Sequence, residues 1–114
     1  MFKLNPSPTF SASVSLSVPG GTVAELPVVF KHKGRKALAE WVKRPAAAAA
    51  EGRELSDAEY LAEVIEDATV FNDEGVAVPF SVDVLAQVLD AYPAAGGELF
   101  AAYMAALTEA KAKN

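Results

Sequence analysis

Residues 10–18 read FSASVSLSV, in which apolar side chains alternate strictly with serine. A strand places successive side chains on opposite faces, so this period of two predicts a strand with one apolar and one polar face. The next run repeats the period with Ala24, Leu26, Val28 and Phe30. Because PGG at 19–21 separates the two runs, the sequence predicts an N-terminal β-hairpin over about residues 9–33.

The length of the turn decides which residues face each other across the hairpin. A two-residue turn would point the two apolar faces in opposite directions, because a slip of one residue inverts every side chain. A three-residue loop over 19–21 aligns Val14 with Leu26 and Phe10 with Phe30. We expect this register, with a glycine at a positive φ angle.

Two further expectations concern the surroundings of the hairpin. Pro27 has no amide hydrogen for a strand ladder, which suggests that its strand lies at an edge of the sheet. A lone hairpin is marginally stable in water. Its apolar face must therefore be covered by helices or by a second copy of the chain.

After Gly34 the apolar period changes to 3.6 residues, which predicts helices. The first helix carries Leu38, Trp41 and Val42 on one face, and Pro45 is expected to stop or kink it. The alanines at 46–50 could continue the helix on propensity alone, so the structure of residues 45–55 stays open.

Three more helices are expected. The second begins at Ser56, which has the capping-box spacing to Glu59, and its buried stripe consists of Leu61, Val64, Ile65 and Ala68. Turn residues follow at 72–75, and the structure of the segment 69–80 stays open.

Ser81 caps the third helix, whose stripe consists of Val84, Leu85, Val88 and Leu89. The last helix starts near Gly96 and carries Leu99, Phe100, Tyr103, Met104 and Leu107. The predicted fold class is α+β, with the hairpin followed by about four α-helices in one small domain.

Composition limits the function classes. The 114 residues suffice for one packed domain, and 52% of them are apolar. The chain has no cysteine, no apolar run of membrane-spanning length, and no signal-peptide pattern at its start. We expect a cytoplasmic protein without disulfides.

Catalytic machinery is not expected. His32 is the single histidine, so with no cysteine the chain lacks the residues for a histidine-rich or thiolate metal site. PGG at 19–21 is not followed by the lysine of a phosphate-binding loop. Acidic residues from Glu59 to Asp67 could line one side of the second helix, where paired carboxylates could hold a divalent cation or act as acid and base. A solvated helix face is their expected role. We therefore expect neither an enzyme nor a cofactor.

Charge is distributed unevenly around a net charge of −5. Six of the ten basic residues lie close together: Lys31, Lys33, Arg35, Lys36, Lys43 and Arg44. Thirteen of the fifteen acids lie between Glu51 and Glu109. The basic cluster could be a solvated surface, a nucleic-acid site, or a surface complementary to the acidic helices of a neighbouring copy. Nucleic acid is not the expected partner, because Trp41 is the only aromatic residue nearby.

The large aromatics of the helical half are Trp41, Phe71, Phe80, Phe100 and Tyr103. Most of them are expected in the core. Phe71 and Phe80 flank a turn-rich segment and are the better candidates for an exposed apolar patch. The candidate partner-binding residues are Trp41, Phe71, Phe80, Lys33, Arg35 and Lys36.

The order of these patterns resembles the tail assembly chaperone family of long-tailed bacteriophages. The resemblance rests on the opening MFKLNPSPTF, the serine and valine strand ending in PGG, and the second strand running into ALAEW at 37–41. It continues with VLAQVLDAYP at 84–93, LFAAY at 99–103 and a lysine and asparagine end. These segments span nearly the whole chain, 1–114, as one domain.

The resemblance implies a non-enzymatic protein in the cytoplasm of the bacterial host, encoded by a phage or prophage. It implies binding to the tape measure protein, recruitment of the tail tube protein, self-association, and absence from the mature virion. In many relatives a ribosomal frameshift produces a longer form, so the end at 111–114 would belong to the short form. The alternatives are a structural tail component, such as a tube or completion protein, and a small dimeric interaction domain or DNA-binding regulator.

Overall fold

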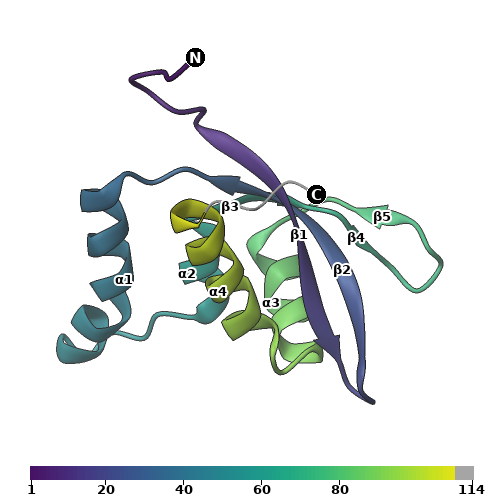
Figure 1. The fold of residues 1–114 in the computed structure, drawn as a ribbon. Helices are drawn as coiled ribbons and strands as arrows, with labels where there is room; N and C mark the ends of the chain where they lie inside the picture. Colours follow the sequence, from purple (N-terminus) through teal and green to yellow (C-terminus); the bar gives the residue numbers. More distant parts are fainter. Residues whose placement is uncertain (110–114) are drawn as a thin grey trace.

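The computed structural model describes residues 1–109 and has the α+β class that the sequence predicts. Its elements follow the order β1 (Thr9–Val18), β2 (Thr22–Lys31), α1 (Arg35–Ala50), α2 (Asp57–Ala62), β3 (Ile65–Ala68), β4 (Val70–Phe71), β5 (Ala77–Val78), α3 (Val82–Ala91) and α4 (Ala95–Thr108) (Figure 1). The hairpin and four helices were expected, whereas the three short strands between α2 and α3 were not. The end at 111–114, expected to mark a short form, lies outside the described residues.

The hairpin has the predicted register. Phe10 is opposite Phe30 and Val14 is opposite Leu26, which confirms the three-residue loop. Gly20 and Gly21 have φ angles of 106° and 91°. Glycine is needed here because side chains with a Cβ atom rarely adopt such angles.

The second helix is shorter than expected, and this part of the sequence-based prediction is wrong. α2 ends at Ala62, and residues 65–68 form β3, which pairs antiparallel with β2. The register shifts between Val29 and Phe30, so Glu66 is an extra residue in β3. This irregularity leaves Ile65 and Ala68 both buried, three residues apart, which is the spacing of a helix rather than of a regular strand.

Pro27 does not mark an edge strand, because β2 lies between β1 and β3. The ladder with β3 covers only Val28 to Phe30, and Pro27 lies just beyond it. The Pro27 carbonyl still accepts a hydrogen bond from the Thr69 amide at 3.0 Å. The missing amide hydrogen therefore falls at the end of the ladder, where it is tolerated in a central strand.

α1 runs through Pro45 to Ala50, so the proline does not stop it. A proline within a helix removes the donor for the carbonyl four residues earlier, here that of Trp41. The Tyr60 hydroxyl replaces the donor by bonding the Trp41 carbonyl oxygen at 2.7 Å. The helix stops before Gly52, whose φ of 72° suits a helix C-terminus.

Trp41 joins α1 to the rest of the fold. Its ring stacks on that of Tyr60 with centroids 4.3 Å apart, and its indole N–H donates to the Tyr60 carbonyl at 3.2 Å. Phe100 and Tyr103 of α4 lie 5.5 and 5.3 Å from the Trp41 ring. Trp41 and Tyr103 are fully buried, which confirms their expected place in the core.

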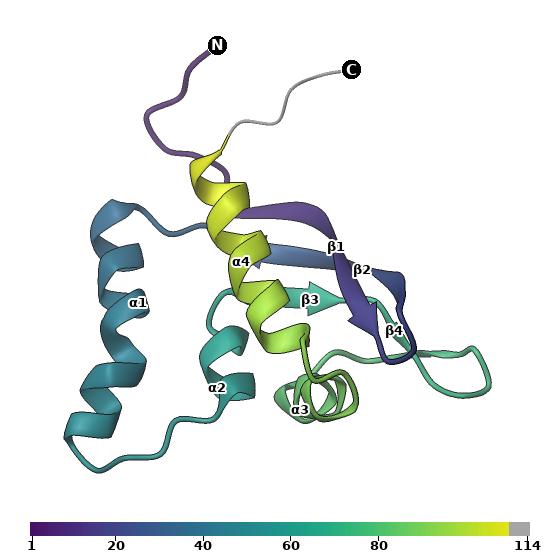
Figure 2. The same cartoon turned by 60° about the horizontal axis from the view of Figure 1, so that its bottom comes forward.

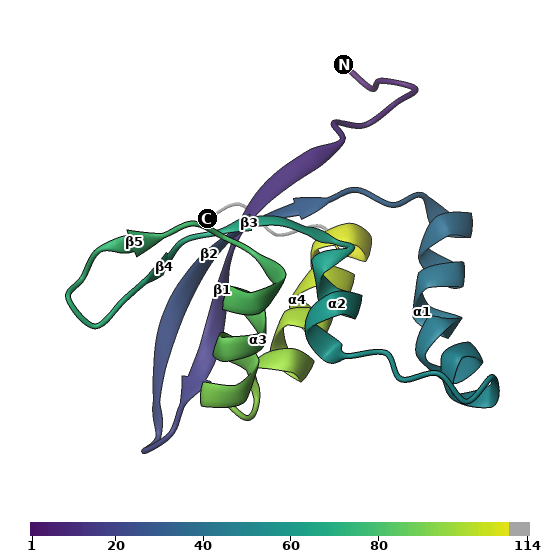
Figure 3. The ribbon, with the colours of Figure 1, turned by 180° about the vertical axis from the view of Figure 1, so that it is seen from behind.

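The helices cover one face of the β1–β2–β3 sheet (Figure 2). On β1, Val14 and Leu16 face the helices and are 4% and 5% exposed, while the intervening serines are exposed. α1 stands at one end of the molecule and the β4–β5 hairpin projects at the other (Figure 3). No helix within residues 1–109 is long and apolar enough to cross a bilayer.

Replacing Tyr60 by Phe should destabilise the protein by about 1–3 kcal/mol, because the Trp41 carbonyl loses its buried donor. Ala at position 45 restores a helix amide that can donate to this carbonyl, so the cost of Tyr60→Phe should shrink in a Pro45→Ala background. Urea unfolding of the four proteins measures this coupling as a double-mutant cycle. Equal costs of Tyr60→Phe in both backgrounds would contradict the proposed replacement of the donor.

Tyr103 should make stability fall at high pH. Burial raises the pKa of its phenol from 10.0 to about 12, and its hydroxyl donates to the Lys31 carbonyl at 2.7 Å. Because the folded chain binds this proton more tightly than the unfolded chain, the contribution to stability is complete below pH 10 and is lost as pH rises towards 12. Tyrosinate absorbance during alkaline titration measures it, with Tyr103→Phe as the control. Ionisation of Tyr103 at pH 10 in a folded chain would refute this expectation.

Candidate partner-binding site

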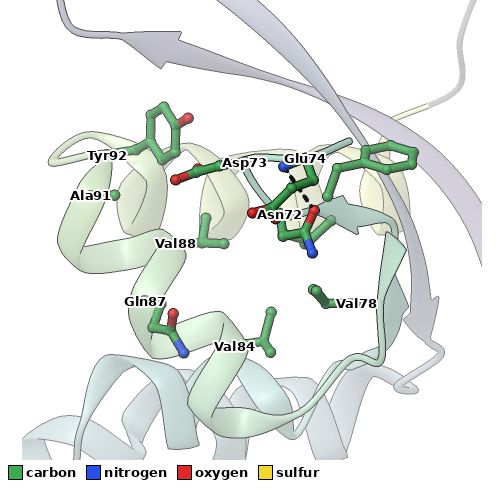
Figure 4. Close-up of a pocket in the computed structure, with 11 residues that line it drawn as sticks. Asn72, Asp73, Glu74, Val78, Val84, Gln87, Val88, Ala91 and Tyr92 are labelled. Carbon is green, nitrogen blue, oxygen red and sulfur yellow. Dashed lines mark hydrogen bonds between the residues drawn. The ribbon is translucent and has the colours of Figure 1, made fainter. Parts of the chain in front are cut away.

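An open groove of about 500 Å³ lies between the β4–β5 hairpin and α3 (Figure 4). Most of its lining is apolar: Val70, Phe71, Val78, Val84, Val88, Ala91 and Tyr92. Asn72, Asp73, Glu74 and Gln87 complete it. An open surface that is mostly apolar and has polar groups at its turn can accept the apolar side of a peptide or helix.

The turn at 72–75, which the sequence predicts, shapes one wall of the groove. It joins β4 to β5 rather than ending a helix. The Asn72 side-chain oxygen accepts hydrogen bonds from the amides of Glu74 and Val76, at 3.0 and 2.9 Å. Gly75 has a φ of 77°, which a residue with a side chain would adopt only with strain. The turn therefore places Asp73 and Glu74 beside the groove.

α3 forms the other wall and is anchored as predicted. The Ser81 hydroxyl accepts from the Val84 amide at 3.1 Å, which caps the helix. Leu85 is 2% exposed and belongs to the core. Val84 and Val88, one turn apart, line the groove and are half-buried.

The hairpin carries two large exposed apolar side chains: Phe71, which lines the groove, and Val76 in the turn, which is not part of the lining. Phe71 is 60% exposed and Val76 is 59% exposed. Phe71 was predicted to be exposed, and this is confirmed. Phe80 is half-buried and packs against the core, so the structure separates the two phenylalanines that the sequence grouped together.

Trp41 occupies a different environment from the other candidates. It is 0% exposed and does not line the groove. Its contribution within the isolated chain is to hold α1 in place.

The three basic candidates lie together at the opposite end of the molecule from the groove (Figures 1 and 3). Lys33 precedes α1, and Arg35 and Lys36 are exposed in its first turn, which has no acidic residue. Cations near a helix N-terminus oppose the helix dipole, so helix stability does not account for them.

Some residues of the basic cluster pair with acidic residues of the same chain. Lys31 lies 3.6 Å from Glu66, and Arg44 pairs with Glu63. These contacts join the basic segment to the acids after α2, so two of the six clustered cations are engaged internally. Glu66 and Asp67 lie on β3, which corrects their expected place on a helix face.

The candidate site does not have the features of a metal centre in the described part of the chain. Within residues 1–109, no three His, Cys, Asp or Glu side chains are grouped closely enough to hold a metal ion. What the groove can do chemically is bind: its walls are apolar and the carboxylates of its turn favour a ligand with a positive charge beside its apolar side.

Sequence reasoning missed the groove, although one signal was present. The stripe on the third helix has four apolar residues, and all were expected to face inward. Leu85, Val88 and Leu89 do pack in or against the core, but Val84 does not, and both Val84 and Val88 line the groove. A stripe this wide can serve two surfaces, which its periodicity alone does not reveal.

The comparison with protein families gives one finding. A model of the family described as phage tail assembly chaperone matches residues 1–114, the whole chain. The comparisons with curated proteins and with solved structures return no match.

The two phenylalanines should differ in their effect on stability. Phe71→Ala should change the free energy of unfolding by less than about 0.5 kcal/mol, because the side chain is mostly in water. Phe80→Ala should cost about 1–3 kcal/mol, because it removes packing against the core. Urea unfolding compares them, and a Phe71→Ala cost as large as that of Phe80→Ala would place Phe71 in the core.

Proposed function

Because the chain belongs to the phage tail assembly chaperone family, we propose that it binds the long helical tape measure protein and keeps it soluble during tail assembly. The family implies interaction with tail proteins and points to a non-enzymatic role. In this proposal the chain acts in the cytoplasm of the bacterial host. It then recruits tail tube subunits, associates with further copies of itself, and leaves before the virion is complete.

The groove between β4–β5 and α3 is the observation that carries the proposal. A helical client that exposes apolar side chains would aggregate unless these were covered. An amphipathic helix buries spaced apolar anchors in a groove of this kind. Phe71 in the lining and Val76 in the adjoining turn are exposed on the hairpin, and the half-buried Val84 and Val88 lie one turn apart on α3.

The acidic turn adds a preference among client segments. Asp73 and Glu74 lie at the groove, and the nearest part of the client would face them. Segments with lysine or arginine beside the apolar stripe would therefore bind faster and more selectively than acidic ones. Lys33, Arg35 and Lys36, at the other end of the molecule, supply a separate surface of opposite charge for the tail tube protein.

Binding to the tape measure protein tests the proposal directly. Phe71→Ser together with Val76→Ser should weaken binding about 30-fold or more, because two anchors worth about 2 kcal/mol in sum are lost. The client should also move to the insoluble fraction on co-expression. Calorimetry with a soluble client fragment and a sedimentation assay of the lysate measure the two effects.

Val23→Ser provides the matched control. Val23 is 67% exposed, close to the 59% of Val76, but lies on β2 in the first hairpin. It should leave client binding unchanged. Equal binding by the groove variant and the wild type would reject the groove as the client site.

Mass spectrometry of purified virions separates the chaperone from the alternative of a structural tail component. A chaperone should be absent from the finished particle, whereas a tube or completion protein would be present in a fixed number of copies. Recovery of the chain at such a stoichiometry would overturn the assembly role itself, independently of the groove.

A further inference from the structure

β1 is an outer strand of the three-stranded sheet, and its backbone groups alternate between the two sides. The Val18 carbonyl accepts from the Gly21 amide at 3.2 Å, and the Pro8 carbonyl accepts from the His32 amide at 2.9 Å, so even-numbered residues point towards β2. The Ser17 amide instead donates to the Glu98 carboxylate at 2.8 Å. The odd-numbered residues therefore present their amides and carbonyls at the outer edge.

This edge lacks the features that usually prevent pairing with another strand. Exposed edges are normally protected by charged side chains, prolines or bulges. Residues 9–18 contain no charged residue and no proline, and all ten pair with β2 in an unbroken register. A long and regular strand without charged residues of its own is a template for a further strand. The Glu25 carboxylate, which accepts from the Ser13 and Ser15 hydroxyls, lies on the polar face of this strand.

The part of the β1 edge that could pair with another strand is limited at both ends. At the C-terminal end, the Glu98 carboxylate binds the Ser17 amide and also the Ser17 hydroxyl, at 2.6 Å. The hydrogen bond from the Ser17 hydroxyl, and to a lesser extent that from the Ser17 amide, keeps the pKa of Glu98 below its usual value. The carboxylate is therefore charged at neutral pH. At the other end, Pro6 and Pro8 stop the strand pattern. Between these two ends lies the segment Thr9 to Ser15, in which Thr9 and the three serines are exposed and Ala12 is at the centre.

We propose that two copies of the chain pair antiparallel through residues 9–15 of β1, about a two-fold axis at Ala12. Thr9 then faces the partner's Ser15, and Ser11 faces the partner's Ser13, so all four outward residues exchange hydrogen bonds. Ala12 meets the partner's Ala12 at a non-hydrogen-bonded position, where the backbones are closest and a small side chain fits. This inference deepens the self-association included in the proposed function by naming the surface.

A second copy suits this edge better than an unrelated strand for two reasons. The pairing places even-numbered residues opposite even-numbered residues, so Phe10 faces the partner's Val14. The apolar face of the sheet therefore continues across the two-fold axis. The partner's Pro8 falls opposite Leu16, so the incoming strand ends just before the Ser17 amide, which Glu98 already occupies. One two-fold symmetric register therefore keeps the paired segment between Pro8 and Ser17 in both copies. Because both copies use the same edge, the assembly stops at a dimer.

A single cysteine at the axis tests the register. The chain has no native cysteine, so Ala12→Cys can form a disulfide only with a second copy. Opposed residues at this position have a Cα separation within the range of a disulfide. Mild oxidation should give a covalent dimer on a non-reducing gel. Val23→Cys, an exposed residue away from the axis, is the control, and equally rapid cross-linking there would overturn the proposed register.

Sedimentation equilibrium of a proline variant tests the hydrogen bonds. Ser13→Pro removes an amide that faces outward, so the β1–β2 ladder is kept, and the dimer dissociation constant should rise about 10- to 30-fold through the loss of one hydrogen bond per copy. Ser13→Ala keeps the amide and loses only the hydroxyl bond to Glu25, so it should dimerise like the wild type. Circular dichroism checks that both variants fold, and the cysteine experiment decides by itself if Ser13→Pro does not.

Three outcomes would overturn the pairing. These are a monomer at every concentration, an assembly that dissociates in high salt, and a dimer unaffected by Ser13→Pro in its folded state. Salt sensitivity would favour the alternative in which the basic cluster meets the acids of a neighbouring copy. Client binding by Ser13→Pro should remain as in the wild type, so failure of the dimer and failure of the chaperone role give different results.

Discussion

The fold depends on the reciprocal contact between Trp41 and Tyr60. Each ring donates a hydrogen bond to the other residue's carbonyl, and the rings stack 4.3 Å apart. The contact satisfies both buried donors and also the carbonyl that Pro45 leaves without an amide partner. Trp41 and Ala48 are the buried residues of α1, so this contact places the helix against α2 and α4. The position of the basic residues before and within the first turn of α1 follows from it.

The groove arises from the way the chain leaves the sheet. β3 pairs with β2 along only a few residues and continues into the β4–β5 hairpin, which projects from the body. α3 then returns with Leu85 in the core and Val84 and Val88 along the groove. An arm that buries few side chains opens at a small cost in free energy, which suits the capture and release of a client that we propose. The acidic turn and the basic segment lie at opposite ends, so one molecule offers two surfaces of unlike charge.

Much of the fold could be predicted from local patterns, and the failures have physical causes. The period of two and the glycines at 20 and 21 determine the hairpin register, because one slip would invert both faces. β3 escaped detection because its register shift at Glu66 gives a helical spacing of buried residues. The continuation through Pro45 depends on Tyr60, a residue distant in sequence. Strands of two residues, such as β4 and β5, carry no readable period, so the groove and the place of Val84 and Val88 in its lining required the structure.

The central claim is that the groove between β4–β5 and α3 holds a helical segment of the tape measure protein. Amide chemical-shift mapping of the isotope-labelled chain, titrated with a soluble client segment, tests it most directly. The account predicts that the largest shifts fall on Val70–Phe71, the turn at 72–75 and α3, while the loop at 19–21 stays unchanged. Shifts concentrated on the serine face of β1 or on α1, with the groove unaffected, would contradict it.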